Sequence, residues 1–571
     1  MTLSILLRPI RSRALRSYVG CMATLLLSPL LCRAAAPSPP HLMVVIAVDQ
    51  FSADLYAEYR SLYTAGLRRL STGVVYPAGY QSHAATETCP GHSTILTGVH
   101  PARSGIIANE WFDQSLARSD KQVYCAEDPS VPGSSSTHYT VSAVQLKVPT
   151  LGDRLKVSTP STRVVSVSGK DRAAVMLGGH AADALWYFNG SAYVSPTADP
   201  TRAAPQATPS PTSSSERVNA HVSAWLAHPT PTALPATCQS HATPLTVGTQ
   251  TIGVPAAPGT QSSPAFRTSP AFDDTTTELA IGLLQELHLG SGPATDILAI
   301  SLSATDYVGH RFGTEGSEMC AQVLNVDRNV GAILDALDAT HVSYVVVLTA
   351  DHGGHDAPER NQQRGFADAL RVDPALLPNT LGTTIAGQFG LPGSALVGRS
   401  AFGDVYIAST VPATLRPQVL RATLAAYNSH PQIAATFTAN TLAGVQRPSH
   451  PVDEWSLAER FSASFDPTRS GDVLVALRPH VTPIAGTNGS LATHGSLATH
   501  GSPWNYDRRV PILFYWPGIH GFEQPLPVET VDIVPTLAAL IGFPLAAADT
   551  DGRCLALQEG TANACERASQ K

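Results

Sequence analysis

The 571-residue sequence contains little charge: Asp, Glu, Lys and Arg together make up 14% of the chain, and the net charge is −7. A slightly acidic chain gives no electrostatic reason to bind nucleic acid or an anionic membrane as its main partner. Repeats of solenoid length are absent, which argues against a repeat architecture. With 43% hydrophobic residues, the chain can bury a large core, as one domain with insertions or as two to four domains.

Long apolar segments are also lacking, except for one run near the N-terminus. Residues 18–31 are shorter than the roughly 20 residues that a membrane-spanning helix needs, and small residues follow them. Four arginines precede the run: Arg8, Arg11, Arg13 and Arg16. This layout predicts a signal peptide over residues 1–36, cleaved near residues 34–36. A membrane anchor fits less well, and a lipoprotein site at Cys32 lacks the small residue expected before it. We expect a periplasmic or secreted chain without a membrane span.

None of the eight cysteines occurs in a CxxC pair, which disfavours a zinc site built from thiolates. Six cysteines remain after removal of the signal peptide. In an oxidising compartment we expect Cys554 and Cys565 to form a disulfide that fastens the C-terminal tail. The pairing of the other four stays open, as does the alternative that they are buried thiols: Cys89, Cys125, Cys238 and Cys320.

Short, continuous apolar runs rich in β-branched residues alternate with helix-like segments. The runs occupy residues 42–49, 163–168, 296–303, 344–351, 472–477 and 510–515. This alternation predicts an α/β fold with a central, mostly parallel sheet and helices on both of its faces. Two segments interrupt the pattern, at about 181–275 and 356–470, and we expect them to be insertions that form a cap on one catalytic domain spanning residues 37–571.

Carboxylates stand where three of these runs end. Asp49 ends the first run, and Asp351 ends the fourth with His352 beside it. Asp306 lies just past residues 296–303. The carboxyl ends of strands form the ligand crevice of open α/β sheets, and three carboxylates there would repel one another unless a cation lay between them. The alternative for any single aspartate is an ordinary helix cap.

Asp306 and His310 are spaced by four residues, so on a helix they would share one face and could bind a metal ion together. Asp351 and His352 add two adjacent ligands. Sites of His and Asp without Cys suit zinc. In ATETCPGHSTILTG (85–98) the Thr88 hydroxyl precedes a helix expected to begin around His92. The helix N-terminus favours an anion, although Thr88 alone also fits a helix cap.

Seven separated motifs resemble those of the alkaline phosphatase superfamily. They are VDQFSADL, ETCPGHSTILTG, GIIANEW, SGKDRAAV, SATDYVGH, TADHGG and HGSPWNYDRRVPILF. Within the superfamily the sequence most resembles the secreted bacterial phosphomonoesterases of the PafA/PhoK type, which use a threonine nucleophile. The motifs run in order from Asp49 to about residue 515 and so cover nearly the whole expected mature chain.

The resemblance implies two Zn²⁺ ions and a phosphothreonine intermediate at Thr88. One ion would be bound by Asp49, Asp351, His352 and Thr88, and the other by Asp306, His310 and a late histidine. Only His500 is followed by the expected Gly-Ser-Pro, whereas His494 ends a near-copy of the same segment. We therefore expect His500 to be the ligand. An additional structural cation such as Ca²⁺ stays open.

The resemblance also places Asn109, Lys170 and Arg172 on the phosphate oxygens. A lysine and a planar arginine suit a dianionic monoester, because a diester has one of these oxygens blocked. The expected protein is a monomeric, zinc-dependent phosphatase acting on small-molecule phosphate monoesters. The alternatives are a phosphodiesterase or nucleotide pyrophosphatase, and a non-catalytic binding protein. We expect structural roles for His83, His92, His180 and His355.

Overall fold

Successive side chains of β1 (Leu42–Val48) point into two different hydrophobic cores. Leu42, Val44 and Ile46 belong to one core, and Met43 and Val45 to the other. A strand covered on both faces reads as a continuous apolar run. The computed structural model describes residues 39–196, 213–230, 234–248, 250–253, 263–485 and 496–558. The predicted signal peptide, His494 and Cys565 lie outside these residues.

β1 lies inside a large sheet with the order β19-β2-β18-β11-β1-β10-β5-β6-β7, and β20 also pairs with β2. The other strands of this sheet are β2 (Val74–Tyr80), β5 (Val164–Ser168), β6 (Ala184–Phe188), β7 (Tyr193–Val194), β10 (Asp296–Leu302), β11 (Tyr344–Thr349), β18 (Arg509–Tyr515), β19 (Phe522–Glu523) and β20 (Val528–Glu529). β1 runs parallel to both β10 and β11, and β5 continues the parallel part. The prediction of a mostly parallel sheet is confirmed. β18 departs from it, because it pairs antiparallel with β11 and β2.

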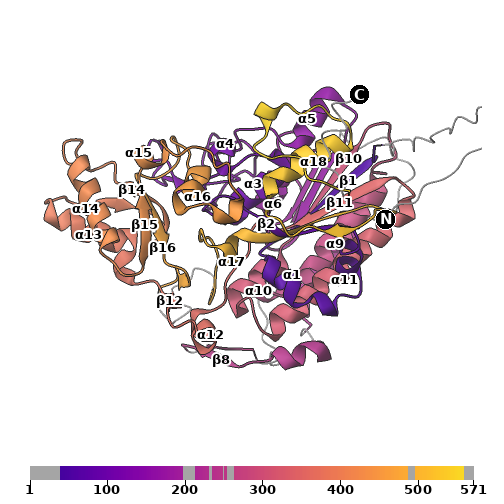
Figure 1. The fold of residues 1–571 in the computed structure, drawn as a ribbon, viewed down its shortest axis with the longest axis horizontal. Coiled ribbons are helices and arrows are strands. Elements are labelled where there is room, and N and C mark those ends of the chain that lie inside the picture. The colour runs from indigo at the N-terminus through magenta and orange to yellow at the C-terminus, as the bar shows by residue number, and fades with distance from the viewer. Residues whose placement is uncertain are drawn as a thin grey trace, which may run out of the picture. The chain divides into compact units, whose positions relative to one another are not determined.

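Helices cover both faces of this sheet (Figure 1). The core that contains Leu42 is covered mainly by α1 (Ala53–Glu58), α2 (Gly66–Leu70), α7 (Ser214–Ala227), α9 (Pro270–Glu286), α10 (Ala304–Phe312) and α11 (Ser317–Thr340). The core that contains Met43 is covered by α3 (Thr88–Thr97), α5 (Leu151–Ser158), α6 (Asp171–Gly178) and α18 (Ile533–Leu540). α3 begins at Thr88 instead of near His92, because Pro90 falls in the first turn, where a missing N–H costs nothing.

The prediction that residues 472–477 belong to the parallel sheet is wrong. β16 (Val473–Leu477) lies in a separate four-stranded sheet with the order β13-β14-β16-β15, drawn in orange in Figure 1. Its partners β14 (Gly403–Ile407) and β15 (Ile433–Phe437) are antiparallel to it, and β13 (Leu396–Val397) completes the sheet. β16 has a core on each of its faces, so its sequence looks like that of a parallel strand. Helices α13 (Pro378–Gln388) and α14 (Arg416–Asn428) pack on it.

Between them, the two predicted insertions contain strands of the large sheet and elements that lie outside that sheet. Residues 181–275 include β6 and β7, which extend the large sheet, and also the hairpin of β8 (Leu245–Val247) and β9 (Gln250–Ile252). Residues 356–470 include α12 (Pro358–Gln363), α15 (Ala439–Leu442), α16 (Leu457–Ser464) and the first strands of the small sheet. The division into a catalytic core with a cap stays a prediction.

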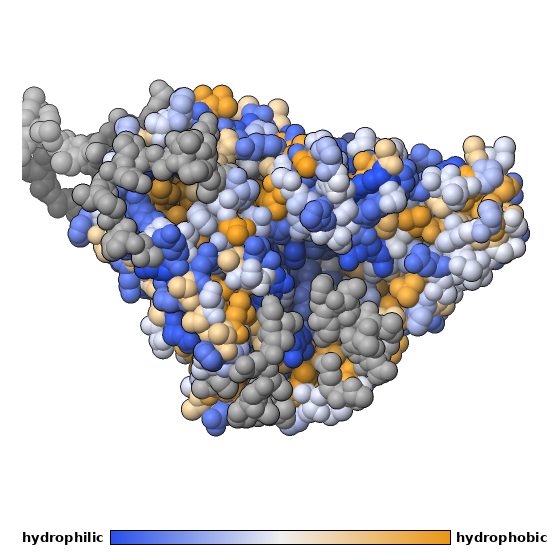
Figure 2. Space-filling view, turned by 180° about the vertical axis from the view of Figure 1, so that it is seen from behind, coloured by the Kyte–Doolittle hydropathy of each residue, from blue (hydrophilic) through white to orange (hydrophobic). Residues whose placement is uncertain are grey.

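The described part of the chain has a hydrophilic hollow on its surface (Figure 2) and disulfides in its interior. Figure 2 shows hydrophilic residues gathered in a hollow near the middle of one face. Among the described helices, none combines the length and apolarity required to cross a bilayer. Among the residues that the structure describes, disulfides join Cys89 to Cys125 and Cys238 to Cys320, which excludes the alternative of buried thiols for these four residues. Disulfides of this kind persist in oxidising compartments.

α10, which carries Asp306 and His310, begins without a side-chain cap of its own. The missing cap comes from α9: the Asp273 carboxylate accepts the backbone N–H groups of Ser303 and Ala304 at 2.8 and 2.9 Å. Asp273 is fully buried, and its other oxygen accepts a bond from Gln322. The cap satisfies N–H groups that the first turn of a helix leaves without partners.

Asp273 should make the stability of the chain depend on pH. Burial raises its pKa from 3.8 to about 7, so the folded chain binds this proton more tightly than the unfolded chain. The stability it contributes is present below the unfolded pKa and is lost as the pH rises through about 7. Asp273→Asn cannot titrate. Its free energy of unfolding, relative to wild type and measured in urea, should therefore be higher at about pH 8 than at about pH 5. A pH-independent difference would contradict this.

Candidate active site

Three buried carboxylates meet at the carboxyl ends of neighbouring strands. Asp49 follows β1 and Asp351 follows β11, whereas Asp306 lies in the first turn of α10, just after β10. All three are at most 2% exposed. Because β1 lies between β10 and β11, the sheet order alone brings the three residues together, as predicted from the sequence.

Histidines complete two groups of potential metal ligands. One group consists of Asp49, Asp351 and His352, and the other of Asp306, His310 and His500; within each, the ligand atoms lie within 4.8 Å of one another. The two groups are adjacent, since the rings of His352 and His500 stack with centroids 3.6 Å apart. Six of the seven side chains predicted from the sequence as metal ligands are thus brought together in two groups, from four segments of the chain.

Backbone carbonyls orient all three histidines in the same way. The Nδ1 atom of His352 lies 2.8 Å from the carbonyl oxygen of Gly353, that of His310 3.0 Å from Ala498, and that of His500 2.7 Å from Thr86. Carbonyls accept, so each Nδ1 carries the proton and each Nε2 presents a lone pair. These lone pairs face carboxylate oxygens at 3.3–3.5 Å. A hydrogen bond from one ring nitrogen fixes the orientation of a histidine that binds a metal ion through its other ring nitrogen.

A lone pair aimed at a carboxylate is repulsive unless a cation lies between the two. His352 Nε2 and Asp306 Oδ1 are buried and have no hydrogen-bond partner among the described residues. Burial, together with the neighbouring Asp351, raises the pKa of Asp49 well above its usual range, and burial lowers the pKa of His352 to about 3. A neutral imidazole and crowded carboxylates are the donor set that a divalent metal ion needs. The two groups therefore fit metal ions.

Lys170 lies between the two groups. Its Nζ atom is 2.5 Å from Asp49 Oδ2 and 2.6 Å from Asp306 Oδ2. Burial lowers the pKa of Lys170, but the two carboxylates outweigh this effect and raise the pKa overall. The ammonium group is therefore charged, and it stands where the two predicted metal sites adjoin.

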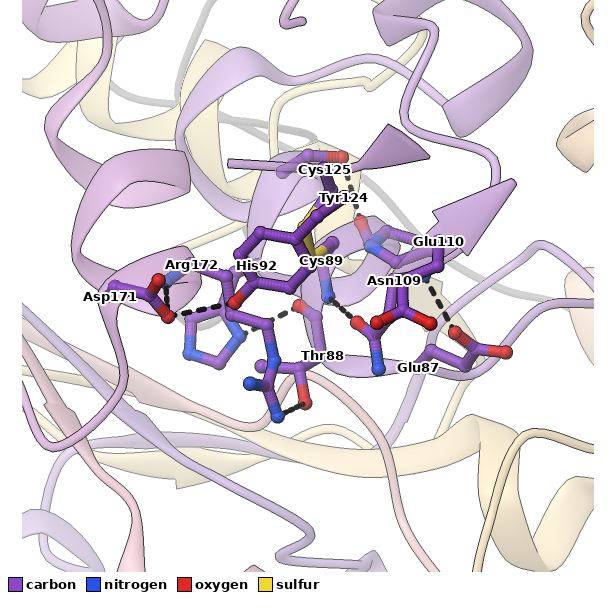
Figure 3. Close-up of a disulfide and its surroundings, with 12 residues drawn as sticks. Glu87, Thr88, Cys89, His92, Asn109, Glu110, Tyr124, Cys125, Asp171 and Arg172 are labelled. Atoms are coloured by element: carbon purple, nitrogen blue, oxygen red, sulfur yellow. Dashed lines mark hydrogen bonds between the residues drawn. A yellow bond between two sulfur atoms is a disulfide. The ribbon is translucent and has the colours of Figure 1, made fainter. Parts of the chain in front are cut away.

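Thr88 opens α3, with Arg172 and Asn109 on either side of it (Figure 3). Arg172 Nη2 lies 3.5 Å from Thr88 Oγ1. His92, one turn further along α3, ties the helix to the metal groups, because its Nδ1 lies 2.9 Å from the Thr88 carbonyl and 3.0 Å from Asp351 Oδ2. The structure thus places Arg172 and Asn109 beside Thr88, the predicted nucleophile (Figure 3).

No role is assigned to Asp171 or to Glu87 from the sequence. Asp171 accepts hydroxyl hydrogen bonds from Tyr124 and Tyr139, both at 2.7 Å, and so fixes the turn that carries Lys170 and Arg172. Glu87 accepts the backbone N–H of Asn109 at 2.7 Å. In both motifs an acidic residue stands directly beside a predicted functional residue. The sequence alone does not show which groups that acidic residue contacts.

Gln50 was also missed. It follows Asp49 with a positive φ of 61°, it is fully buried, and neither amide atom has a hydrogen-bond partner among the described residues. Its amide lies between two glycines of the metal-binding motifs. A Cβ at Gly309 would stand 1.8 Å from Gln50 Oε1, and one at Gly354 would stand 2.5 Å from Nε2. The Gln50 side chain therefore lies between α10, which carries Asp306 and His310, and the segment that carries Asp351 and His352, and it sets the distance between them.

The other histidines expected to be structural lie outside the two ligand groups, and two of them have other partners. His180 lies 3.2 Å from Asp153, and His355 Nε2 lies 3.0 Å from Thr482 Oγ1. His83 is fully buried, and neither of its ring nitrogens has a partner in the described part of the chain. None of these belongs to the two metal groups found among the described residues, so a structural role for them stays the prediction.

Comparisons with known proteins agree with this geometry. The model of the type I phosphodiesterase / nucleotide pyrophosphatase family matches residues 43–503. The chain is 48% identical to alkaline phosphatase PhoD of Zymomonas mobilis, over 92% of this chain and 90% of that protein. It is 50% identical to alkaline phosphatase PhoK of a Sphingomonas species, over 93% and 94%. The crystal structure of alkaline phosphatase PafA superposes with a TM-score of 0.76 at 23% identity, over 90% and 98% of the two chains.

The fold and the two metal groups define a member of the alkaline phosphatase superfamily, and the chain belongs to its type I phosphodiesterase / nucleotide pyrophosphatase family. Within that family it is a hydrolase of the PafA/PhoK alkaline phosphatase type.

If Gln50 keeps α10 apart from the segment that carries Asp351, a larger residue at Gly309 should destabilise the chain, and removal of the Gln50 side chain should restore part of the stability. Gly309→Ala should lower the free energy of unfolding by about 1–3 kcal/mol, because the new Cβ overpacks the buried amide. Gln50→Gly in the same chain should recover part of this loss, since glycine removes the side chain and tolerates the positive φ. The measurement is urea unfolding with chelator present.

Gly387→Ala is the matched control, because its Cβ would meet nothing within 4 Å inside helix α13. This change should be neutral or stabilising. If Gly309→Ala behaved like the control, the spacing role of Gln50 would be wrong.

Proposed function

We propose that the chain hydrolyses phosphate monoesters to an alcohol and inorganic phosphate through a phosphothreonine at Thr88, with two zinc ions as cofactors. The observation that carries this proposal is the placement of two cationic side chains, the buried Lys170 and the partly buried Arg172, beside the ligand groups and the Thr88 hydroxyl. Lys170 lies between the two ligand groups, and Arg172 lies 3.5 Å from Thr88 Oγ1.

Zinc is the metal that best matches the donors. Each group offers carboxylate oxygen and imidazole nitrogen, and there is no thiolate among them. Asp49, Asp351, His352 and Thr88 would hold one ion, and Asp306, His310 and His500 the other. When bound, a pair of such ions supplies Lewis-acid stabilisation to the attacking and leaving oxygens of a phosphoryl transfer.

The protein's own groups define the steps. The Thr88 hydroxyl gives up its proton to solvent and Oγ1 attacks phosphorus. An Oγ1–P bond forms, and the ester P–O bond breaks with its electron pair leaving on the alcohol oxygen, which takes a proton from solvent. Water then attacks phosphorus and loses a proton to solvent, and the Oγ1–P bond breaks with its electron pair on Oγ1, which takes up a proton, so that the Thr88 hydroxyl is restored and inorganic phosphate is released. Lys170, Arg172 and the Asn109 amide neutralise and orient the non-bridging oxygens throughout.

The same residues favour monoesters over diesters. A monoester presents a dianionic group with three unsubstituted oxygens, to which a guanidinium can donate two parallel hydrogen bonds. A diester carries a substituent on one of these oxygens and one charge fewer. Phosphodiesterase activity is the second candidate function, because the family model that matches this chain bears that description.

We further propose that the protein is exported. This is supported by the two disulfides and by the arginines, apolar run and small residues at the N-terminus.

Removal of the proposed nucleophile should abolish turnover. Thr88→Ala should lower kcat for a nitrophenyl phosphate monoester by about 10⁴-fold or more, whereas Thr88→Ser keeps a hydroxyl and should retain measurable activity. Acid quenching of the Ser variant or wild type with ³²P-labelled substrate should trap label on the chain. A Thr88→Ala protein as active as wild type would refute the phosphothreonine.

The monoester preference should depend on Arg172. Arg172→Ala should lower kcat/KM for the nitrophenyl monoester by about 10²–10³-fold and lower that for the matching diester much less, because the diester uses fewer of these contacts. Arg478→Ala, at an exposed position, is the control and should change neither. Faster diester than monoester turnover by wild type would favour the second candidate function instead.

A further inference from the structure

The Cys89–Cys125 disulfide lies directly beside the nucleophile. Cys89 follows Thr88 in the first turn of α3, and Cys125 follows β4 (Gln122–Tyr124), which pairs with β3 (Glu110–Phe112). Both sulfurs belong to fully buried residues in one apolar cluster, which also contains Trp111 and Tyr124. The bond therefore joins the start of the nucleophile helix to a hairpin 36 residues further along the chain.

Both cysteines also hold Asn109. The backbone N–H of Cys89 donates to Asn109 Oδ1 at 2.8 Å, and the backbone N–H of Cys125 donates to the Asn109 carbonyl at 3.0 Å (Figure 3). Glu87 accepts the Asn109 backbone N–H at 2.7 Å. The side-chain oxygen and both backbone groups of Asn109 are thus engaged. Its amide NH₂ is the group left for a phosphate oxygen.

The neighbour of Cys125 reaches the other phosphate-binding residues. The Tyr124 hydroxyl donates to Asp171 Oδ1 at 2.7 Å, and the same oxygen accepts the backbone N–H of Arg172 at 2.8 Å. Asp171 stands between Lys170 and Arg172. Through Cys125, one covalent bond therefore couples the position of Thr88 to those of Asn109 and of the Lys170–Arg172 turn.

The three metal-ligand histidines, unlike Thr88, are held by contacts away from the disulfide. Carbonyls of Gly353, Ala498 and Thr86 orient the three histidines, and none of these belongs to the β3–β4 hairpin. Loss of the disulfide should therefore loosen phosphate binding more than metal binding.

We propose that Cys89 and Cys125 are positioning residues for the phosphate-binding half of the active site, so that the phosphatase reaches full activity only after this disulfide has formed. The proposal rests on the proposed function and deepens it. Formation of the bond removes two electrons and two protons from the two thiols, and a disulfide-carrying oxidant of the export compartment accepts them. The chain would then have low activity in a reducing cytosol.

The second disulfide provides the matched control. Cys238 and Cys320 join the segment η2 (Ala236–His241) to α11 within the core that contains Leu42. None of the contacts described above links either cysteine to the phosphate-binding residues. Removing either bond removes one cross-link from a buried place, but only one of the two adjoins Thr88.

The test compares the Cys89→Ser/Cys125→Ser and Cys238→Ser/Cys320→Ser double variants with wild type, well below their melting temperatures. The first should lose at least about tenfold in kcat/KM for the monoester, and the inhibition constant of inorganic phosphate should rise by a similar factor. Zinc content should stay at two ions per chain. The second variant should melt at a lower temperature than wild type and keep wild-type kinetics.

Several results would overturn the proposal. They are unchanged phosphate inhibition in the Cys89/Cys125 variant, equal kinetic losses in both variants, or a loss of zinc that matches the loss of activity. If the Ser pair does not fold, Cys89→Ala/Cys125→Ala makes the same comparison. Failure of both to fold, while the control folds, would assign the bond to folding instead. A wild type that binds phosphate but hydrolyses no monoester refutes the proposed function, and calorimetric phosphate binding by the variants still decides the role of the disulfide.

Discussion

Electrostatic repulsion among three buried carboxylates is the constraint on which the rest of this structure depends. Asp49, Asp306 and Asp351 are fixed by the ends of β1, β10 and β11, which are neighbours in the sheet, so they cannot separate without breaking it. Lys170 compensates one charge, and two cations bound by these groups and the histidines would compensate the rest. A site that concentrates cations in this way is suited to hold a phosphate dianion.

The surrounding chain keeps these charges at fixed positions. Carbonyls orient the histidines, Asp273 caps the helix that carries Asp306, and the Gln50 amide spaces two ligand arms. On the phosphate side, Asp171 and the Cys89–Cys125 disulfide do the same for the cationic residues and Asn109. Preorganised groups of this kind need no rearrangement during the reaction, and this is the usual source of catalysis in phosphoryl transfer.

Strand ends and the spacing of Asp306 and His310 are local signals, and they predicted most of the sheet and five of the six side chains that meet as candidate metal ligands; the family resemblance added His500. The sequence misplaced residues 472–477, since a buried antiparallel strand has the same apolar pattern as a parallel one. It missed β2, whose Pro77 and Gly79 interrupt the run, and could not pair Cys89 with Cys125. The role of Gln50 was equally hidden, because it depends on two glycines more than 250 residues away.

The most direct test of the central claim is an anomalous diffraction map of crystals of the purified protein, recorded at the zinc absorption edge. The account predicts two peaks, one among Asp49, Asp351, His352 and Thr88, and the other among Asp306, His310 and His500. A map with no peak at these positions, in crystals of protein that hydrolyses phosphate monoesters, would contradict it.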